Sequence, residues 1–266
     1  MNLNAYTLSL LKDDTDIYTP SWLVVPAGLC QQFRKVLRRS EDDVVERGYN
    51  LRWVRGSQNP LIEIAPTLYV GDHNTVNLGS EKAHLEMSYI GDFHIHPYRQ
   101  RYGAHVSIGP SSGDWQGWHE YFPQHKKCGI FIVASGNHLF LIVFRRKPAV
   151  LQVPRNLDAH RLMAFRQGLN KYQNQDFSDA VNGRQWDEYR RLLNQTSPAG
   201  AMWHQEDVHN MNREFAENNG CEYFRGELKD NGVSYVYLQS NRILGNWLTA
   251  RIWAKPSQPW LHSSLF

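Results

Sequence analysis

The chain has few cysteines, and they show no pattern typical of a disulfide framework. Only Cys30, Cys128 and Cys221 occur among 266 residues, and no two of them have the two-residue spacing of a zinc-binding or redox motif. An odd and sparse set of this kind argues against both a disulfide framework and a cysteine-rich zinc site. A reducing compartment fits the sequence best.

Long apolar runs and clustered charge are also missing. No run of about eighteen apolar residues occurs, and the first residues lack the basic start and apolar stretch of a secretory signal. The formal net charge is only +3, and Lys and Arg alternate with acidic residues. We therefore expect a soluble cytoplasmic protein with no membrane partner and no nucleic-acid partner.

The hydrophobic residues that are present, 41% of the chain, suffice to bury a core. The length favours two domains, and Pro148 and Pro154 mark the expected end of the first, at residues 1–152. Its pattern predicts an α/β fold, an α+β sandwich in which helices flank a mixed β-sheet. The predicted helices cover 26–39 and the residues after Asp114, and the predicted strands cover 22–25, 50–54, 61–70, 85–96, 129–133 and 138–144.

Residues 153–266 are expected to form a smaller α+β domain of unknown role, suited to binding a substrate or partner. Helical spacing of apolar residues predicts three helices, and a tight Asn-Gly turn predicts a hairpin. Its aromatic residues, Tyr235 and Tyr237 among them, are expected in the core. The helices are predicted at 158–172, 184–193 and 206–218, and the hairpin strands at 222–228 and 233–238.

A short stretch holds the residues that suggest chemistry. His94 and His96 are two apart on a predicted strand, so both imidazoles project from the same face while Ile95 points into the core. Asp114, which follows a loop, would add an oxygen ligand. Two nitrogens and one oxygen from protein leave a fourth position for water, which is the pattern of catalytic zinc sites. The sequence therefore predicts a Zn²⁺ site.

This pattern resembles the JAMM (JAB or MPN-plus) metalloproteases, whose signature is a distant Glu, then His-x-His-Pro, then Ser-x-x-Asp. Here His94-Ile95-His96-Pro97 and Ser111-Ser112-Gly113-Asp114 match the last two parts. The resemblance covers roughly residues 20–147. It implies a zinc metalloprotease or isopeptidase that acts on a protein or peptide, such as a conjugate of a ubiquitin-like modifier.

The resemblance also implies two catalytic residues. Glu46, in Glu46-Arg47-Gly48-Tyr49, corresponds to the family's general acid/base, and Ser111 to the residue that stabilises the oxyanion. Tyr49 stands where the family has a second Gly, and the loop from His96 to Ser111 is about seven residues longer than usual. Three other acids stay open as alternatives to Glu46, namely Glu63, Glu81 and Glu86.

Other interpretations remain open. The two histidines could be hydrogen-bonded strand residues, and Ser111-x-x-Asp114 could be a helix cap, a role compatible with metal binding. The whole chain could be a catalytically silent MPN-type scaffold that binds protein partners. It also resembles the RadC-type proteins of DNA metabolism, which share a related metal motif.

Overall fold

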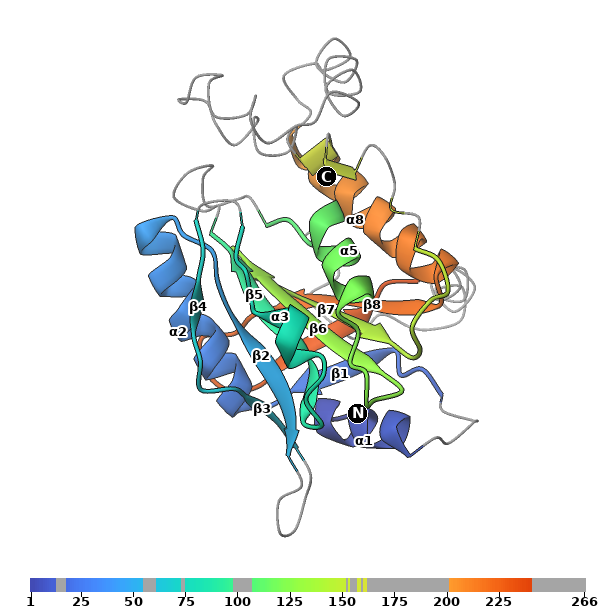
Figure 1. Cartoon of the computed structure of the whole chain (residues 1–266). Coiled ribbons are helices and arrows are strands. Elements are labelled where there is room, and N and C mark those ends of the chain that lie inside the picture. The colour runs from blue at the N-terminus through green and yellow to red at the C-terminus, as the bar shows by residue number, and fades with distance from the viewer. Residues whose placement is uncertain are drawn as a thin grey trace.

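The computed structural model describes residues 1–12, 18–54, 61–72, 75–97, 107–151, 153, 157–158, 160–161 and 201–240. In these ranges the centre of the protein is a nine-stranded mixed sheet with the order β1-β9-β8-β7-β6-β5-β2-β3, and β4 also pairs with β2 (Figure 1). The strands are β1 (Trp22–Val25), β2 (Arg47–Val54), β3 (Leu61–Ile64), β4 (Tyr69–Val70), β5 (Tyr89–His96), β6 (Gly129–Ser135), β7 (His138–Phe144), β8 (Cys221–Glu227) and β9 (Ser234–Leu238).

Helices cover both faces of the sheet. One face packs against α1 and α2, which contribute Leu3 and Phe33 to an apolar core, and the other packs against α5 and α8, which contribute Trp115 and Phe215 to a second core. Figure 1 shows α5 and α8 side by side, away from α2. The helices are α1 (Leu3–Leu11), α2 (Ala27–Asp43), α3 (Ser80–Ala83), α5 (Ser112–Glu120) and α8 (Ala201–Asn218).

Strand β5 lies inside the sheet and is buried along its whole length. It pairs antiparallel with β2 and parallel with β6. The close approach to β6 depends on Gly91, whose φ is +149° and where a Cβ would stand 1.8 Å from the carbonyl oxygen of Ile130. No side chain fits in that space, so the glycine lets the two strands pair.

The connection from β5 through α5 to the parallel strand β6 explains why three element ends lie together: the end of β5, the start of α5 and the start of β2. A crossover of this kind places the carboxyl end of its first strand beside the amino end of its helix. Because β2 runs antiparallel to β5, with Gly48 opposite His94, the start of β2 also lies at this end. The topology therefore collects His94, His96, Asp114 and Glu46 at one edge of the sheet.

Several predicted elements are confirmed and others need correction. Strand β1, the β6–β7 hairpin and the β8–β9 hairpin occur where the sequence predicts them. Helix α2 continues past the predicted end at 39 to Asp43, and Val44 then stops it in the left-handed conformation, with φ 55°. The strand predicted over 85–96 begins only at Tyr89, after helix α3, and the strand predicted over 61–70 is two strands, β3 and β4.

The division into domains at 1–152 and 153–266 does not hold for the described residues. Strand β8 pairs with β7 along the whole length of both strands, and β9 pairs with both β8 and β1. The C-terminal strands therefore complete the first sheet instead of forming another. Of the predicted helices at 158–172 and 184–193, all but residues 158, 160 and 161 lie outside the described residues.

The aromatic residues of the last hairpin are divided between core and surface. Tyr223 and Phe224 are buried, as predicted, but Tyr235 and Tyr237 are 43% and 39% exposed, so the prediction that they belong to the core is wrong. They occupy alternate positions of β9, whose other face buries Ser234 and Val236. Within the described ranges, none of the helices has the length and apolar character needed to cross a membrane.

Candidate metal centre

His94 and His96 project from the same face at the carboxyl end of β5. Their Nε2 atoms are 3.2 Å apart, and the two side chains are almost fully buried. Ile95, between them, points to the opposite face and is part of the core beneath α2. The period-two alternation of the strand thus produces the paired imidazoles that the sequence predicts.

Asp114 comes from the first turn of α5, and local sequence explains its position. Ser111 is the N-cap residue: its Oγ accepts a hydrogen bond from the Asp114 backbone N–H at 3.1 Å, and its own N–H donates to Asp114 Oδ2 at 2.6 Å. This reciprocal capping box fixes the carboxylate at the helix start. Asp114 Oδ1 lies 3.1 Å from His94 Nε2, and Oδ2 lies 3.4 Å from His96 Nε2.

The three side chains satisfy a geometric test for zinc. Each offers one ligand atom, and within the described residues this is the group in which such atoms lie within 4.8 Å of one another. Donor atoms about 2.0–2.2 Å from a tetrahedral ion lie about 3.3–3.6 Å from each other. Here the two Nε2 atoms are 3.2 Å apart, and a different Asp114 oxygen faces each of them, at 3.1 Å from His94 and 3.4 Å from His96, so the group is close to that size. Two imidazoles and a carboxylate are also ligand types that zinc accepts.

The outer nitrogens of the imidazoles face acceptors. His96 Nδ1 lies 3.3 Å from the carbonyl oxygen of Ile108, a contact that favours the proton on Nδ1 and leaves Nε2 free to bind a metal. His94 Nδ1 lies 3.7 Å from Asp92 Oδ1, which also accepts a hydrogen bond from the Trp118 indole. Asp92 therefore stands behind His94 at the distance of an ion pair.

Asp92 was not among the predicted site residues, although the sequence contains a signal for it. It lies two residues before His94 on the same strand, so the alternation that pairs His94 with His96 places it on that face as well. Burial raises the pKa of its carboxyl group. A buried carboxylate behind a ligating histidine is a recurrent feature of zinc sites.

Burial and mutual contact shift the pKa values of all three candidate ligands. Burial raises the pKa of Asp114, but the charge on His94 holds it well below the ordinary value. Burial lowers the pKa of His94, yet the Asp114 carboxylate outweighs this and raises it to about 10. Burial lowers the pKa of His96 to about 4. At neutral pH His94 and Asp114 therefore form a buried pair of opposite charges beside a neutral His96.

Glu46 immediately precedes β2 and is only 4% exposed. Because Gly48 pairs with His94, extending the register by two residues places Glu46 opposite His96, on the same face of the sheet. Burial raises the pKa of Glu46 to about 8, and the charges on His94 and Asp114 act on it in opposite directions. The carboxyl group thus lies within electrostatic range of the ligands.

Sterics explain why the residue two after Glu46 is a glycine, Gly48. A Cβ at Gly48 would lie 2.6 Å from the Phe93 carbonyl oxygen and 2.9 Å from His94 Cβ. Only glycine lets β2 approach β5 this closely. Tyr49, the residue that departs from the family pattern, points to the other face, where it packs against the α2 core. Its side chain therefore does not enter the site.

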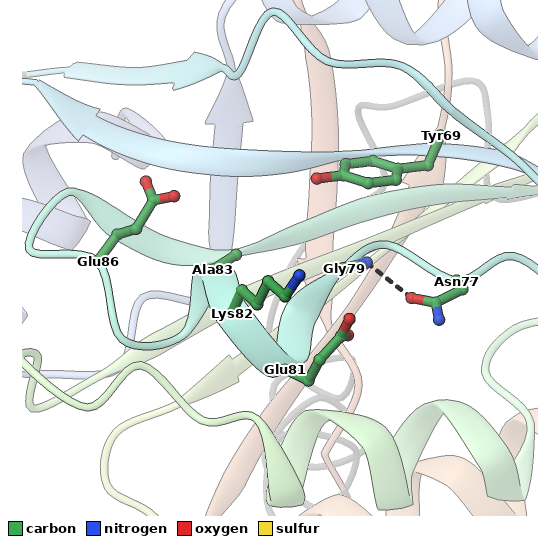
Figure 2. Close-up of a pocket in the computed structure, with 7 residues that line it drawn as sticks. All are labelled: Tyr69, Asn77, Gly79, Glu81, Lys82, Ala83 and Glu86. Atoms are coloured by element: carbon green, nitrogen blue, oxygen red, sulfur yellow. Dashed lines mark hydrogen bonds between the residues drawn. The ribbon is translucent and has the colours of Figure 1, made fainter.

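The three alternative acids lie elsewhere. Glu63 is exposed on β3, and Glu86 forms an exposed ion pair with Arg52, 3.2 Å away. Figure 2 shows Glu81 and Glu86 at a surface hollow of about 480 Å³, whose described lining includes none of the three metal-ligand candidates. Of the four glutamates considered, Glu46 is the one that is buried beside the ligands.

The structure places Ser111 beside Asp114, and its cap role coexists with the turn of the carboxylate toward the imidazoles. Most of the long loop, residues 98–106, lies outside the described residues. No protein-family model matches the chain. A search of the curated proteins also finds no significant relative. The site must therefore be interpreted from its own geometry.

Proposed function

We propose that this protein is a zinc-dependent hydrolase of the JAMM type that cleaves amide or isopeptide bonds. The observation that carries the proposal is the convergence of His94, His96 and Asp114 at separations of 3.1–3.4 Å. The buried Glu46 on the same face supports it. The His-x-His-Pro and Ser-x-x-Asp motifs supply the resemblance to the family.

The residues divide the chemistry among them. His94, His96 and Asp114 would hold zinc, which when bound acts as a Lewis acid on water and on a carbonyl group. Glu46 takes the proton of the attacking water at its carboxylate and delivers it to the departing amine nitrogen. Burial raises the pKa of Glu46 to about 8, which is close to that of an acid/base working near neutral pH. By resemblance, Ser111 donates to the developing oxyanion.

The proposed substrate is a protein or peptide, and by resemblance a conjugate of a ubiquitin-like modifier. A cytoplasmic location is part of the proposal, and it is supported by the cysteines, since Cys30, Cys128 and Cys221 are all buried and free. Nucleic acid is not an expected partner, because the basic residues alternate with acidic ones along the sequence.

Two other functions lead to different measurements. A silent MPN-type scaffold would bind partners without binding zinc, and the complete ligand set with a buried acid argues against it. A RadC-like protein of DNA metabolism would bind DNA with a steep dependence on salt. Zinc analysis distinguishes the scaffold from the proposed hydrolase, and a DNA-binding titration at two salt concentrations distinguishes the RadC-like protein from it.

The direct test is a cleavage assay on zinc-loaded protein, with fusions to ubiquitin-like modifiers and unfolded peptides as substrates, with and without a chelator. Glu46→Gln should keep its zinc and lose turnover by ~10²–10⁴-fold, because the acid/base is removed and the ligands are not. Glu63→Gln, the same change at an exposed glutamate, should cleave like the wild type. Normal turnover by Glu46→Gln would reject its assigned role.

A further inference from the structure

The segment that carries Asp114 is held in place by residues from far along the chain. From Ser107 to Ser112, its backbone groups bond mainly to side chains. Ser135 Oγ accepts from the Ile108 N–H at 3.2 Å, and Arg161 donates to the Gly109 carbonyl at 2.8 Å. Asp158 accepts from the Ser112 N–H at 3.0 Å. Residues beyond 152 thus fix the entry to α5.

Asn212, on α8, makes the most specific of these contacts. Its side chain is fully buried, and its Oδ1 accepts from the Trp115 indole N–H at 2.6 Å. Its Nδ2 donates to the carbonyl oxygens of Pro110 at 3.3 Å and Val208 at 3.0 Å. Since an indole can only donate and a carbonyl can only accept, these partners define one orientation of the amide.

The positions that Asn212 connects lie on either side of the ligand. With Ser111 as N-cap and Asp114 as the third helical residue, Pro110 is the residue before the cap and Trp115 the fourth helical residue. These are the two positions that a hydrophobic staple joins at helix starts, where it fixes the angle at which the chain enters the helix. Here a buried amide from another helix joins them by hydrogen bonds.

We propose that Asn212 is a positioning residue for the metal centre: its amide ties Pro110 to Trp115 and so keeps the Asp114 carboxylate aimed at His94 and His96. The inference rests on the metal binding in the proposed function, though not on hydrolysis. Removing a group that hydrogen-bonds directly to a ligand lowers metal affinity by about 10–100-fold, and Asn212, which bonds to the residues around Asp114, should act at the lower end of that range.

The test is a zinc titration of the full chain against a chromophoric chelator. Asn212→Leu, of similar size, should raise the zinc Kd by about 10-fold. Asn210→Leu, the same change at an exposed position of α8, should leave the Kd unchanged. Trp115→Phe, which removes the indole donor and shortens the buried ring, should also weaken binding. The double variant should be less affected than the product of the two single fold-changes, because both break one connection.

The visible spectrum of the cobalt-loaded protein distinguishes positioning from general stabilisation. Asn212→Leu should change the ligand-field bands, since Asp114 no longer keeps its place, whereas a merely structural role would lower the Tm and leave the bands and the Kd as in the wild type. If Asn212→Leu does not fold, Trp115→Phe decides. Wild-type Kd and spectrum in the folded variants would overturn the proposal.

The outcomes for the wild type separate this inference from the proposed function. A wild-type chain that binds neither zinc nor cobalt contradicts both. One that binds zinc and cleaves none of the substrates contradicts hydrolysis alone, and the Asn212 titrations then still test the positioning role.

Discussion

Strand β5 has two buried faces of opposite character. Phe93 and Ile95 point into the apolar core with α1 and α2, while Asp92, His94 and His96 lie on the face that packs against α5. The apolar face gains from burial alone and needs no particular partner. The polar face is stable only where each group has a partner, because a buried polar group without one costs free energy.

The same division extends beyond β5. His94, His96 and His209, the buried histidines of the described residues, all lie on the side of α5 and α8. Two of their partners come from other elements: the Ile108 carbonyl oxygen faces His96, and the Tyr223 hydroxyl lies 3.4 Å from His209 Nδ1. One side of the sheet therefore serves mainly as core, and the other combines a core with buried polar and titratable groups.

The largest expected effect comes from removing residues 153–266, because this removes side chains from the apolar cores on both faces of the sheet. Strand β8 supplies Phe224 to the core beneath α1 and α2, and Tyr223 to the core beneath α5 and α8. Without β8 the apolar strand β7 becomes an open edge. The 1–152 fragment should aggregate or melt without a cooperative transition, as measured by circular dichroism. A cooperatively folded fragment would restore the two-domain division.

Two single substitutions, one on each face of β5, test whether the two faces have independent roles. His96→Ala should weaken zinc binding by more than ~100-fold, because it removes a ligand, whereas losing a residue that only hydrogen-bonds to a ligand costs about 10–100-fold. Ile95→Val should leave zinc affinity unchanged and lower the free energy of unfolding by ~0.5–1.5 kcal/mol. Zinc titration and urea unfolding measure the two effects. Equal loss of zinc in both variants would show that the faces are not independent.

The smallest expected effect is a pH dependence of folding stability that arises from His209, on α8. Burial holds the pKa of His209 well below its ordinary value, with the Arg225 charge acting in the same direction. The unfolded chain, with a histidine pKa of about 6.5, therefore binds more protons as pH falls. This contribution to stability is complete above about pH 6.5 and is lost below it.

Between pH 7 and pH 5 the free energy of unfolding should therefore fall, because His209 takes up a proton in the unfolded chain and not in the folded one. His209→Phe keeps the ring that stacks on Phe140 and removes the titrating group. Urea unfolding at the two pH values should show a smaller drop for the variant. Parallel curves for the two proteins would mean that His209 does not titrate on unfolding.

The parts of the site that are local in sequence could be predicted. The alternation His94-Ile95-His96 gives the facing imidazoles, and Ser111-x-x-Asp114 gives the cap. Their positions depend on short-range geometry alone. Asp92 follows the same alternation and could have been found from it. Glu46 needed the family resemblance, since its place beside the ligands follows from the antiparallel pairing of β2 with β5.

The long-range parts could not be predicted. The apolar strand β7 requires a neighbour on each side, but its sequence does not say that this neighbour begins at Cys221. The predicted boundary at 152 failed for that reason. Asn212 likewise looks like an ordinary helix residue until the fold brings it to Trp115. Helix α1 was not predicted, and it is stabilised by burying Leu3 and Tyr6 against the sheet.

The most direct test of the account is the zinc content of the purified protein after dialysis, measured by elemental analysis for the wild type and for Asp114→Ala. The geometry predicts one zinc ion per wild-type chain and a large loss in the variant, because Asp114 supplies the oxygen ligand nearest to both imidazoles. A wild-type chain without zinc, or a folded Asp114→Ala chain that keeps a full equivalent, would contradict it.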